Sequence, residues 1–252
     1  MTELDIGFSQ SQGDRSYQED AWGKVVWPNG FTLALLSDGM GGAVAGETAS
    51  NEMLEAFKES FIESTEPSIK LRLKESLIDA NTHLQGLIKA DSSLDGMGGT
   101  IIATAFTGEK IVWVSVGDSP LWLVRKGEIS QINENHSRWA ELLKLVESGK
   151  MTQEELDQHP ERNQLTSAVM GYEIEQVDIG EAEVDVDDWI LLASDGVETL
   201  TEKEINLLCS RPGWDSAQSL AEHLIQQVDK VERPGQDNSS VIALHVNGKD
   251  ES

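Results

Sequence analysis

Two aspartate–glycine pairs in this sequence each follow a stretch of apolar residues. Asp38 and Gly39 come after Leu-Ala-Leu-Leu-Ser, and Asp195 and Gly196 come after Trp-Ile-Leu-Leu-Ala-Ser. Such stretches are typical of buried strands, so each aspartate has a short side chain on a rigid backbone, which suits a fixed ligand for a hard cation. The glycine lets the backbone turn so that its carbonyl can face the same ion. A single Asp-Gly pair most often marks only a turn, but two copies after similar strands indicate a site.

Two more pairs of neighbouring residues, each with at least one acidic member, lie where other strands are predicted to begin. Asp237 and Asn238 precede the last apolar stretch, and Glu19 and Asp20 precede the first. If the carboxylates of Glu19 and Asp237 lie beside those of Asp38 and Asp195, any two of them ~5 Å apart repel each other by roughly 3 kcal/mol at an effective dielectric constant of about 20. Divalent cations remove this conflict, and ligation by oxygen alone favours magnesium or manganese over zinc or copper. The pattern therefore predicts a carboxylate metal site.

The segment Asp-Gly-Met-Gly-Gly that starts at Asp38 recurs letter for letter at Asp95. The second copy precedes its strand instead of ending one, so Asp95 is not predicted to be a ligand. The glycines after Asp38 also match neither G-x-G-x-x-G nor a Walker loop. Because Asp38 would repel a bound pyrophosphate, a nucleotide-binding turn is disfavoured.

Composition excludes several classes of function. The 252 residues include 45 acidic and 19 basic ones, for a formal net charge of −26, which makes nucleic acids and anionic membranes poor partners. Cys209 is the only cysteine, so an intramolecular disulfide and a cysteine-rich zinc site are not expected. Arg211 follows it at plus two, without the longer phosphate-binding loop of thiol-based phosphatases, so we expect Cys209 to be buried in a helix. The chain shows neither a signal peptide at Met1–Phe8 nor an apolar run long enough for a membrane span. We expect a soluble cytoplasmic protein.

The chain reads as one α+β domain, because no linker composition interrupts it. Short strands joined by tight turns predict antiparallel sheets, and longer periodic segments predict covering helices. The predicted strands are 22–27, 31–36, 100–107, 111–116, 121–125, 129–132, 177–186, 189–193 and 240–246. The predicted helices are 47–63, one from about 67 to 89, a polar helical insertion at 138–163, and one capped by Ser216.

In this order along nearly the whole chain, the motifs resemble the metal-dependent protein phosphatases (type 2C serine/threonine phosphatases) in their bacterial stand-alone form. The motifs that carry the resemblance are Gly13-Asp14-Arg15 with Glu19-Asp20, Asp38-Gly39-Met40-Gly41-Gly42 with Gly46-Glu47, Met97-Gly98-Gly99-Thr100, Val116-Gly117-Asp118-Ser119, His136-Ser137, Leu165-Thr166, Ser194-Asp195-Gly196 and Asp237-Asn238.

The resemblance implies a four-layer αββα sandwich, in which pairs of antiparallel helices flank two antiparallel sheets. It implies one phosphatase domain over residues 1–248, with a flap subdomain at about 138–165 and a short polar tail at 249–252. Two Mn²⁺ or Mg²⁺ ions, with a possible third, would lie between the sheets.

The family's site residues carry over to this sequence one by one. Asp38 resembles the ligand that bridges the two ions, and Asp195 and Asp237 would complete the shell of one ion. Glu19 and the Gly39 carbonyl would serve the other ion. Asp118 resembles a ligand of the third ion, which it would bind together with Asp195. Asp20 and Asn238 would support the ligands from behind. Arg15 resembles the residue that holds the substrate phosphate.

The function implied is hydrolysis of phosphoserine and phosphothreonine on proteins, by a bridging water that the two metal ions activate. The substrates would be phosphoproteins made by a partner kinase in bacterial signalling. We expect a monomer that binds neither nucleic acid nor membrane.

Some positions depart from the family pattern. Met40 stands where some members have a histidine proposed as general acid, Pro120 replaces an arginine and Asn135 an aspartate. His136 could be catalytic, although lone histidines are more often structural. Two other functions stay open: a catalytically silent phosphoprotein-binding domain, and an aspartyl-phosphate phosphatase that uses Asp185-Val186-Asp187.

Overall fold

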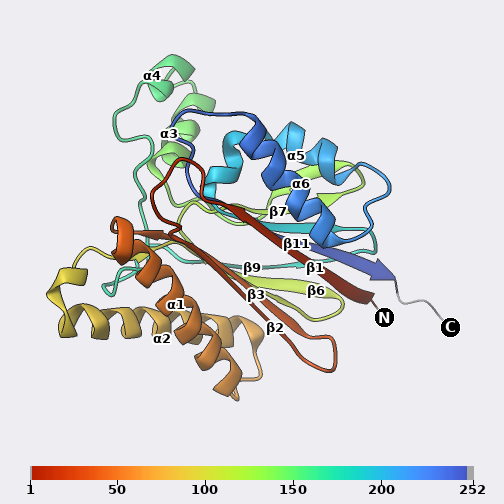
Figure 1. The fold of residues 1–252 in the computed structure, drawn as a ribbon, viewed down its shortest axis with the longest axis horizontal. Helices are drawn as coiled ribbons and strands as arrows, with labels where there is room; N and C mark the ends of the chain where they lie inside the picture. Colours follow the sequence, from red (N-terminus) through yellow and green to blue (C-terminus); the bar gives the residue numbers. More distant parts are fainter. Residues whose placement is uncertain (1, 249–252) are drawn as a thin grey trace.

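The computed structural model describes residues 2–248, apart from the side chain of Ala43. The tail predicted at 249–252 lies outside the described residues. Two antiparallel sheets lie face to face, with a helix pair on the outside of each (Figure 1). The predicted α+β fold with four αββα layers is confirmed.

The first sheet has the strand order β1-β11-β10-β7-β8. Its strands are β1 (Thr2–Ser11), β11 (Ser239–Gly248), β10 (Trp189–Ala193), β7 (Leu121–Arg125) and β8 (Glu128–Gln131). The second sheet has the order β2-β3-β5-β6-β9, and the short strand β4 pairs with the end of β3. Its strands are β2 (Asp20–Val26), β3 (Thr32–Met40), β4 (Gly98–Gly99), β5 (Ile101–Phe106), β6 (Lys110–Val116) and β9 (Asp178–Glu183).

Three apolar clusters hold the layers together. Helices α1 (Ala43–Glu63) and α2 (Ile69–Ala90) pack on the second sheet through residues such as Phe57, Leu77 and Leu35. Helices α5 (Glu202–Cys209) and α6 (Ala217–Lys230) pack on the first sheet, and Ser216 caps α6 as predicted. The third cluster fills the space between the sheets, where alternate strand residues such as Leu36, Ile102, Leu192 and Ile242 meet.

Two short helices, α3 (Arg138–Glu147) and α4 (Gln153–Asp157), lie at one end of the molecule, drawn in green in Figure 1. Thr152 and Glu155 form the predicted capping box of α4. Two 3₁₀ turns complete the structure, η1 (Ser92–Leu94) and η2 (Asp195–Thr199). None of the helices in the described part of the chain has the length and hydropathy needed to span a bilayer.

The structure corrects the prediction that Asp38 ends a strand. Strand β3 continues to Met40, so Asp38 and Gly39 lie inside it, whereas Asp195 does follow the end of β10 and begins η2. The longer strand arises because Gly39 pairs with Gly99 of β4, a contact between glycines far apart in the sequence. Strand β1 was not predicted at all.

Candidate active site

A pocket of about 280 Å³, the acidic pocket, contains most of the predicted site residues. Five carboxylates and one arginine line it, and they come from both sheets. The lining residues are Arg15, Glu19, Asp38, Gly39, Met40, Gly41, Gly42, Thr100, Asp118, Asn163, Leu165, Asp195, Asp237 and Asn238.

The position of Asp38 is fixed by hydrogen bonds of its backbone. Its N–H donates to Thr100 Oγ1 at 3.1 Å, and its carbonyl accepts from the N–H of Thr100 at 2.9 Å. The Thr100 hydroxyl lies 2.6 Å from that of Ser119, which is fully buried beside Asp118. The second sheet therefore provides a rigid support for Asp38 and connects it to the loop that carries Asp118.

Asn238 ties the Glu19 segment to the first sheet. Its Oδ1 accepts from the N–H of Glu19 at 2.8 Å, and its Nδ2 donates to the carbonyls of Gln12 and Tyr17 at 2.8 and 3.0 Å. Behind it, the buried Asp20 accepts from Ser194 Oγ at 2.8 Å. The predicted supporting residues Asp20 and Asn238 thus join segments of the two sheets.

Arg15 and Asp237 form an ion pair at the mouth of the pocket. Arg15 Nη2 lies 2.5 Å from Asp237 Oδ2, and the two side chains are 51% and 38% exposed. The other carboxylate oxygen of Asp237 accepts from the N–H of Asn238 at 2.8 Å. Because the pair is exposed to solvent, its net contribution to stability is at most about 1 kcal/mol. A phosphate or a cation could therefore replace either partner at small cost.

His136 supports the loop of Asp118 rather than lining the acidic pocket. Its ring Nδ1 accepts from the N–H of Gly117 at 3.2 Å, and its backbone N–H donates to the Gly117 carbonyl at 2.9 Å. Gly117 has φ +106°, a conformation that favours glycine. Burial lowers the pKa of His136, so this histidine is neutral at pH 7. The structure thus favours the structural role for it.

Two glycines are required where the backbone approaches the acidic side chains. A Cβ on Gly46, in the first turn of α1, would lie 2.1 Å from Glu19 Oε1. A Cβ on Gly39 would lie 2.2 Å from the carbonyl of Gly46 and 2.5 Å from that of Glu19. The start of α1 is therefore packed directly against the Glu19 side chain.

Burial in this pocket disfavours the charged form of its carboxylates. Desolvation, then the charges of Asp20 and Asp195, raise the pKa of Asp38 well above its ordinary value. Burial also raises the pKa of Asp20 and of Asp118 to about 7, and that of Asp195 in the same direction. Without a counter-charge, the site is expected to hold protons near neutral pH.

The supporting contacts of several residues were not predicted from the sequence, although Thr100 and Ser194 belong to the motifs named above. Thr100 positions Asp38, Ser194 binds Asp20, and Asn163 of the segment after α4 lines the pocket. Ser194 could have been found, because a serine precedes both Asp-Gly pairs. Asn163 could not, because only the path of the chain brings it to the carboxylates. Asp95 is absent from the pocket lining, as expected for the second copy of the motif.

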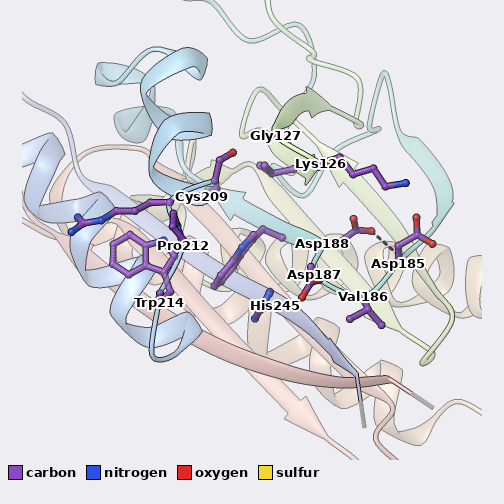
Figure 2. Close-up of a pocket in the computed structure, with 15 residues that line it drawn as sticks. Lys126, Gly127, Asp185, Val186, Asp187, Asp188, Cys209, Pro212, Trp214 and His245 are labelled. Atoms are coloured by element: carbon purple, nitrogen blue, oxygen red, sulfur yellow. Dashed lines mark hydrogen bonds between the residues drawn. The ribbon is translucent and has the colours of Figure 1, made fainter. Parts of the chain in front are cut away.

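A larger pocket of about 680 Å³ lies elsewhere, lined by Trp189, Trp214 and His245 among others (Figure 2). Trp189 begins β10 and Asp195 follows its end, so this pocket is roughly 20 Å from the carboxylates at ~3.3 Å per strand residue. In Figure 2, Asp185 and Asp187 lie on the opposite side of this pocket from Trp214. Asp185 and Asp187 thus line this second pocket and not the acidic pocket.

Cys209 also borders this second pocket, and it is buried at the end of α5 as predicted. Burial raises the pKa of its thiol to about 12, so it is not a thiolate at neutral pH. The exclusion of thiol chemistry is consistent with this environment.

Comparison with known proteins agrees with the geometry. The family model "Protein phosphatase 2C" matches residues 9–238. The serine/threonine protein phosphatase PstP of Mycobacterium tuberculosis is 34% identical over 170 residues, which cover 67% of this chain and 32% of PstP. This chain thus spans about a third of the length of PstP. A putative protein phosphatase 2C-type of Streptococcus pyogenes is 29% identical over 244 residues, covering 94% of each protein.

The fold is also shared with solved phosphatase structures. The catalytic domain of PstP, in a complex with two manganese ions, superposes with a TM-score of 0.81 at 26% identity, covering 98% of this chain and 100% of that one. The match of the family model spans all the residues of the acidic pocket, from Arg15 to Asn238. The chain therefore belongs to the protein phosphatase 2C family.

Proposed function

We propose that this chain hydrolyses phosphoserine and phosphothreonine in proteins, at a pair of Mn²⁺ or Mg²⁺ ions held in the acidic pocket. The observation that carries the proposal is that five carboxylates from two sheets line one small pocket with an arginine at its mouth. Membership of the protein phosphatase 2C family and the manganese-bound structure of PstP support it.

The residues of the pocket fit divalent cations. Glu19 Oε1 and Asp195 Oδ1 are buried without a hydrogen-bond partner in the described part of the chain, which is costly unless a cation faces them. Within residues 2–248, no three carboxylate, histidine or cysteine side chains gather closely enough to enclose an ion by themselves. Magnesium-like ions keep several waters and take only a few protein oxygens, so water would complete the shell of each ion held by these carboxylates.

The ligand roles follow the family pattern. Asp38 would contact both ions, Asp195 and Asp237 would complete one, and Glu19 with the Gly39 carbonyl would complete the other. Asp118 would bind a third ion together with Asp195. When bound, the ions supply a nucleophile at neutral pH and offset charge on the phosphoryl group.

The protein itself supplies orientation and charge. Arg15 would bind two phosphate oxygens through its guanidinium fork, in exchange for its contact with Asp237. Asn238 holds the backbone of Glu19, and Asp20 lies buried behind it. The segment 138–165, which we propose as the flap, contributes Asn163 and Leu165 to the pocket lining. No histidine lines the pocket among the described residues, so protonation of the leaving group is left to water.

We further propose that the chain is one phosphatase domain over residues 1–248 that acts as a cytoplasmic monomer. Its substrates would be phosphoproteins made by a partner kinase. The relatives named as serine/threonine phosphatases support only the part of this proposal that concerns phosphoprotein substrates.

The test is hydrolysis of p-nitrophenyl phosphate and of a phosphothreonine peptide while Mn²⁺ is titrated into chelator-treated protein. We expect no turnover without metal and recovery with manganese. Asp38→Asn should lower kcat at least a hundredfold, because it removes the ligand shared by both ions. Asp187→Asn, the same chemical change in the remote pocket, should have no effect.

Wild-type turnover by Asp38→Asn, or full activity in the presence of chelator, would contradict the proposal. If folded, metal-loaded protein bound phosphopeptides without hydrolysing them, the silent binding domain would be the better description. Loss of activity in Asp187→Asn but not in Asp38→Asn would favour the aspartyl-phosphate alternative.

A further inference from the structure

A groove of about 470 Å³, here called the flanking groove, adjoins the acidic pocket. The two share Met40, Asn163 and Leu165 as lining residues, so a peptide chain that leaves the acidic pocket can enter the groove directly. The other residues that line the groove are Gln164, Thr166, Ser167, Ala168, Met170, Tyr172, Glu173 and Glu175.

The flanking groove combines an apolar surface with an acidic edge. Met40, Leu165 and Met170 give it thioether and aliphatic surface that adapts to different side chains. Glu173 and Glu175 are both exposed at the surface. Among the described residues that line the groove there is no lysine, arginine or histidine to neutralise them.

Contacts with helix α2 hold this wall of the groove in place. Asn81 accepts from the N–H of Gly171 at 2.8 Å and donates to the carbonyl of Tyr172 at 2.6 Å. Gln85 donates to the carbonyl of Gly171 at 2.8 Å. Gly171 has φ +74°, and a Cβ there would lie 2.8 Å from the backbone nitrogen of Gln85. The turn that presents Tyr172 and Glu173 is therefore tightly packed against α2.

The second copy of the glycine motif supports the same wall. Asp95 Oδ1 accepts from the Tyr172 hydroxyl at 2.8 Å. Gly99 and Val169 exchange two backbone hydrogen bonds, of 3.0 and 2.9 Å, in an isolated bridge. The second copy of the motif thus joins the groove to β4, and β4 pairs with the Asp38 strand. The groove is preorganised relative to the site, which lowers the cost of binding an extended ligand.

We infer that the flanking groove binds the residues on one side of the phosphoserine or phosphothreonine, and that Glu173 and Glu175 select substrates with a lysine or arginine there. The inference rests on the proposed function. The substrate class is thus a phosphopeptide with an apolar residue close to the phosphorylated one and a basic residue further along. An acidic residue at the same place meets like charge and is disfavoured.

The acidic pocket and the flanking groove differ in the charged groups that they offer, so each suits a different part of the substrate. Arg15 is the only basic residue among the described residues that line the acidic pocket, and it suits the phosphate. The flanking groove carries only negative charge, so it suits the opposite sign. A peptide with a phosphate at one point and a basic residue a few positions away matches both.

The experiment measures kcat/KM on a phosphothreonine peptide of neutral composition and on copies with one lysine placed at each of about four positions on either side. At one or two of these positions, on one side only, lysine should raise kcat/KM about fivefold, the effect of an exposed ion pair. Raising the salt concentration should reduce this preference. Glutamate at the same positions should lower kcat/KM.

The variant Glu173→Gln/Glu175→Gln should bring the ratio of basic to neutral peptide close to 1. Each rate is divided by the same protein's turnover of p-nitrophenyl phosphate, so a general loss of activity does not enter the ratio. Glu59→Gln/Glu63→Gln is the matched control, since it removes two exposed charges from α1, with Glu63 at the helix end farthest from Gly42. This control should keep the wild-type ratio.

A double variant that keeps the full preference for lysine, or a wild type without any, would overturn the inference. If both double variants lost the preference for lysine equally, the preference would come from the net charge of the protein, and the inference would again be overturned. These outcomes are distinct from failure of the proposed function, in which the metal-loaded wild type hydrolyses neither p-nitrophenyl phosphate nor any phosphopeptide.

Discussion

Asp20 and Asp38 lie directly opposite each other on the antiparallel strands β2 and β3, so their side chains share one face of the sheet. Asp20 is buried and Asp38 is half-buried, and like charges placed in this way destabilise each other. Burial is the main reason that the pKa of Asp20 is raised from 3.8 to about 7. At the scale of single residues, the site is thus a set of acids that favours either protons or cations.

Asp20→Asn should therefore stabilise the metal-free protein in a pH-dependent way. A raised pKa means that the folded protein keeps a proton that the unfolded chain releases above about pH 4. The stability linked to this proton is complete below pH 4 and is lost as the pH rises through 7. Since one pKa unit corresponds to about 1.4 kcal/mol, Asp20→Asn should gain a few kcal/mol at pH 8 and little at pH 4.

Urea unfolding at both pH values, with chelator present, measures this difference. Asp215→Asn, at an exposed aspartate before α6, controls for the loss of one negative charge. An equal effect of Asp20→Asn at pH 4 and pH 8 would show that Asp20 does not hold the proton.

At the scale of elements, the start of α1 is fitted to a side chain of another segment. Gly46 lies in a helix, where alanine is ordinarily better by up to about 1 kcal/mol. At this position the alanine Cβ would lie 2.1 Å from Glu19 Oε1, so Glu19 would have to move. Gly86 lies in α2 with nothing within 4 Å of its added Cβ. The two glycines therefore provide a matched pair.

Gly46→Ala should lower phosphatase activity tenfold or more, the usual cost of disturbing the support of a metal ligand. Gly86→Ala should leave activity unchanged and raise the free energy of unfolding by about 0.5–1 kcal/mol. Kinetics at saturating Mn²⁺ and thermal unfolding measure both effects. A fully active Gly46→Ala would show that Glu19 has space that the structure does not indicate.

The elements also show what the sequence can predict. The apolar periodicity of α6 and β10 and the capping box of α4 identified these elements, because their signals are local. Strand β1 was missed although Leu4, Ile6 and Phe8 alternate as they do in a half-buried strand. Its partner β11 lies at the other end of the chain, a distant pairing without a local signal. The end of β3 was misplaced because Gly39 is paired by Gly99, a distant contact.

Some parts of the candidate site could likewise be predicted from the sequence, and others could not. Glu19, Asp38, Asp195 and Asp237 stood out because each adjoins an apolar stretch of the sequence, and all four line the acidic pocket. The flanking groove could not, because its wall depends on Asn81 and Gln85 of α2, about ninety residues before Gly171 and Tyr172. Asp95 was not predicted to be a ligand and is absent from the lining of the acidic pocket, but its hydrogen bond to Tyr172 has no local signal.

At the scale of the whole molecule, the acidic pocket joins the two sheets. Asp38 belongs to the second sheet, whereas Asp195 and Asp237 adjoin strands β10 and β11 of the first. The apolar cluster between the sheets brings these acids close to one another despite their charge. Cations bound there would therefore stabilise the packing of one sheet on the other.

Mn²⁺ should accordingly raise the melting temperature of the chelator-treated protein. At a hundred times the Kd, a ligand of the folded state adds about 2.7 kcal/mol. For a chain of this size that corresponds to a shift of roughly 5–10 °C. Differential scanning fluorimetry with Mn²⁺, against a monovalent salt of equal ionic strength, measures the shift. An equal shift in Asp38→Asn would place the stabilising ion elsewhere.

The ion pair between Arg15 and Asp237 means that each of these side chains already has a partner of opposite charge. A cation that binds Asp237 releases the guanidinium, and a phosphate that binds Arg15 releases the carboxylate. Each ligand thus removes a competitor of the other, so metal and phosphate are expected to bind with positive heterotropic cooperativity. By thermodynamic reciprocity, the factor by which metal tightens phosphate binding equals the factor by which phosphate tightens metal binding. Product phosphate would then dissociate more readily from a protein that has lost an ion.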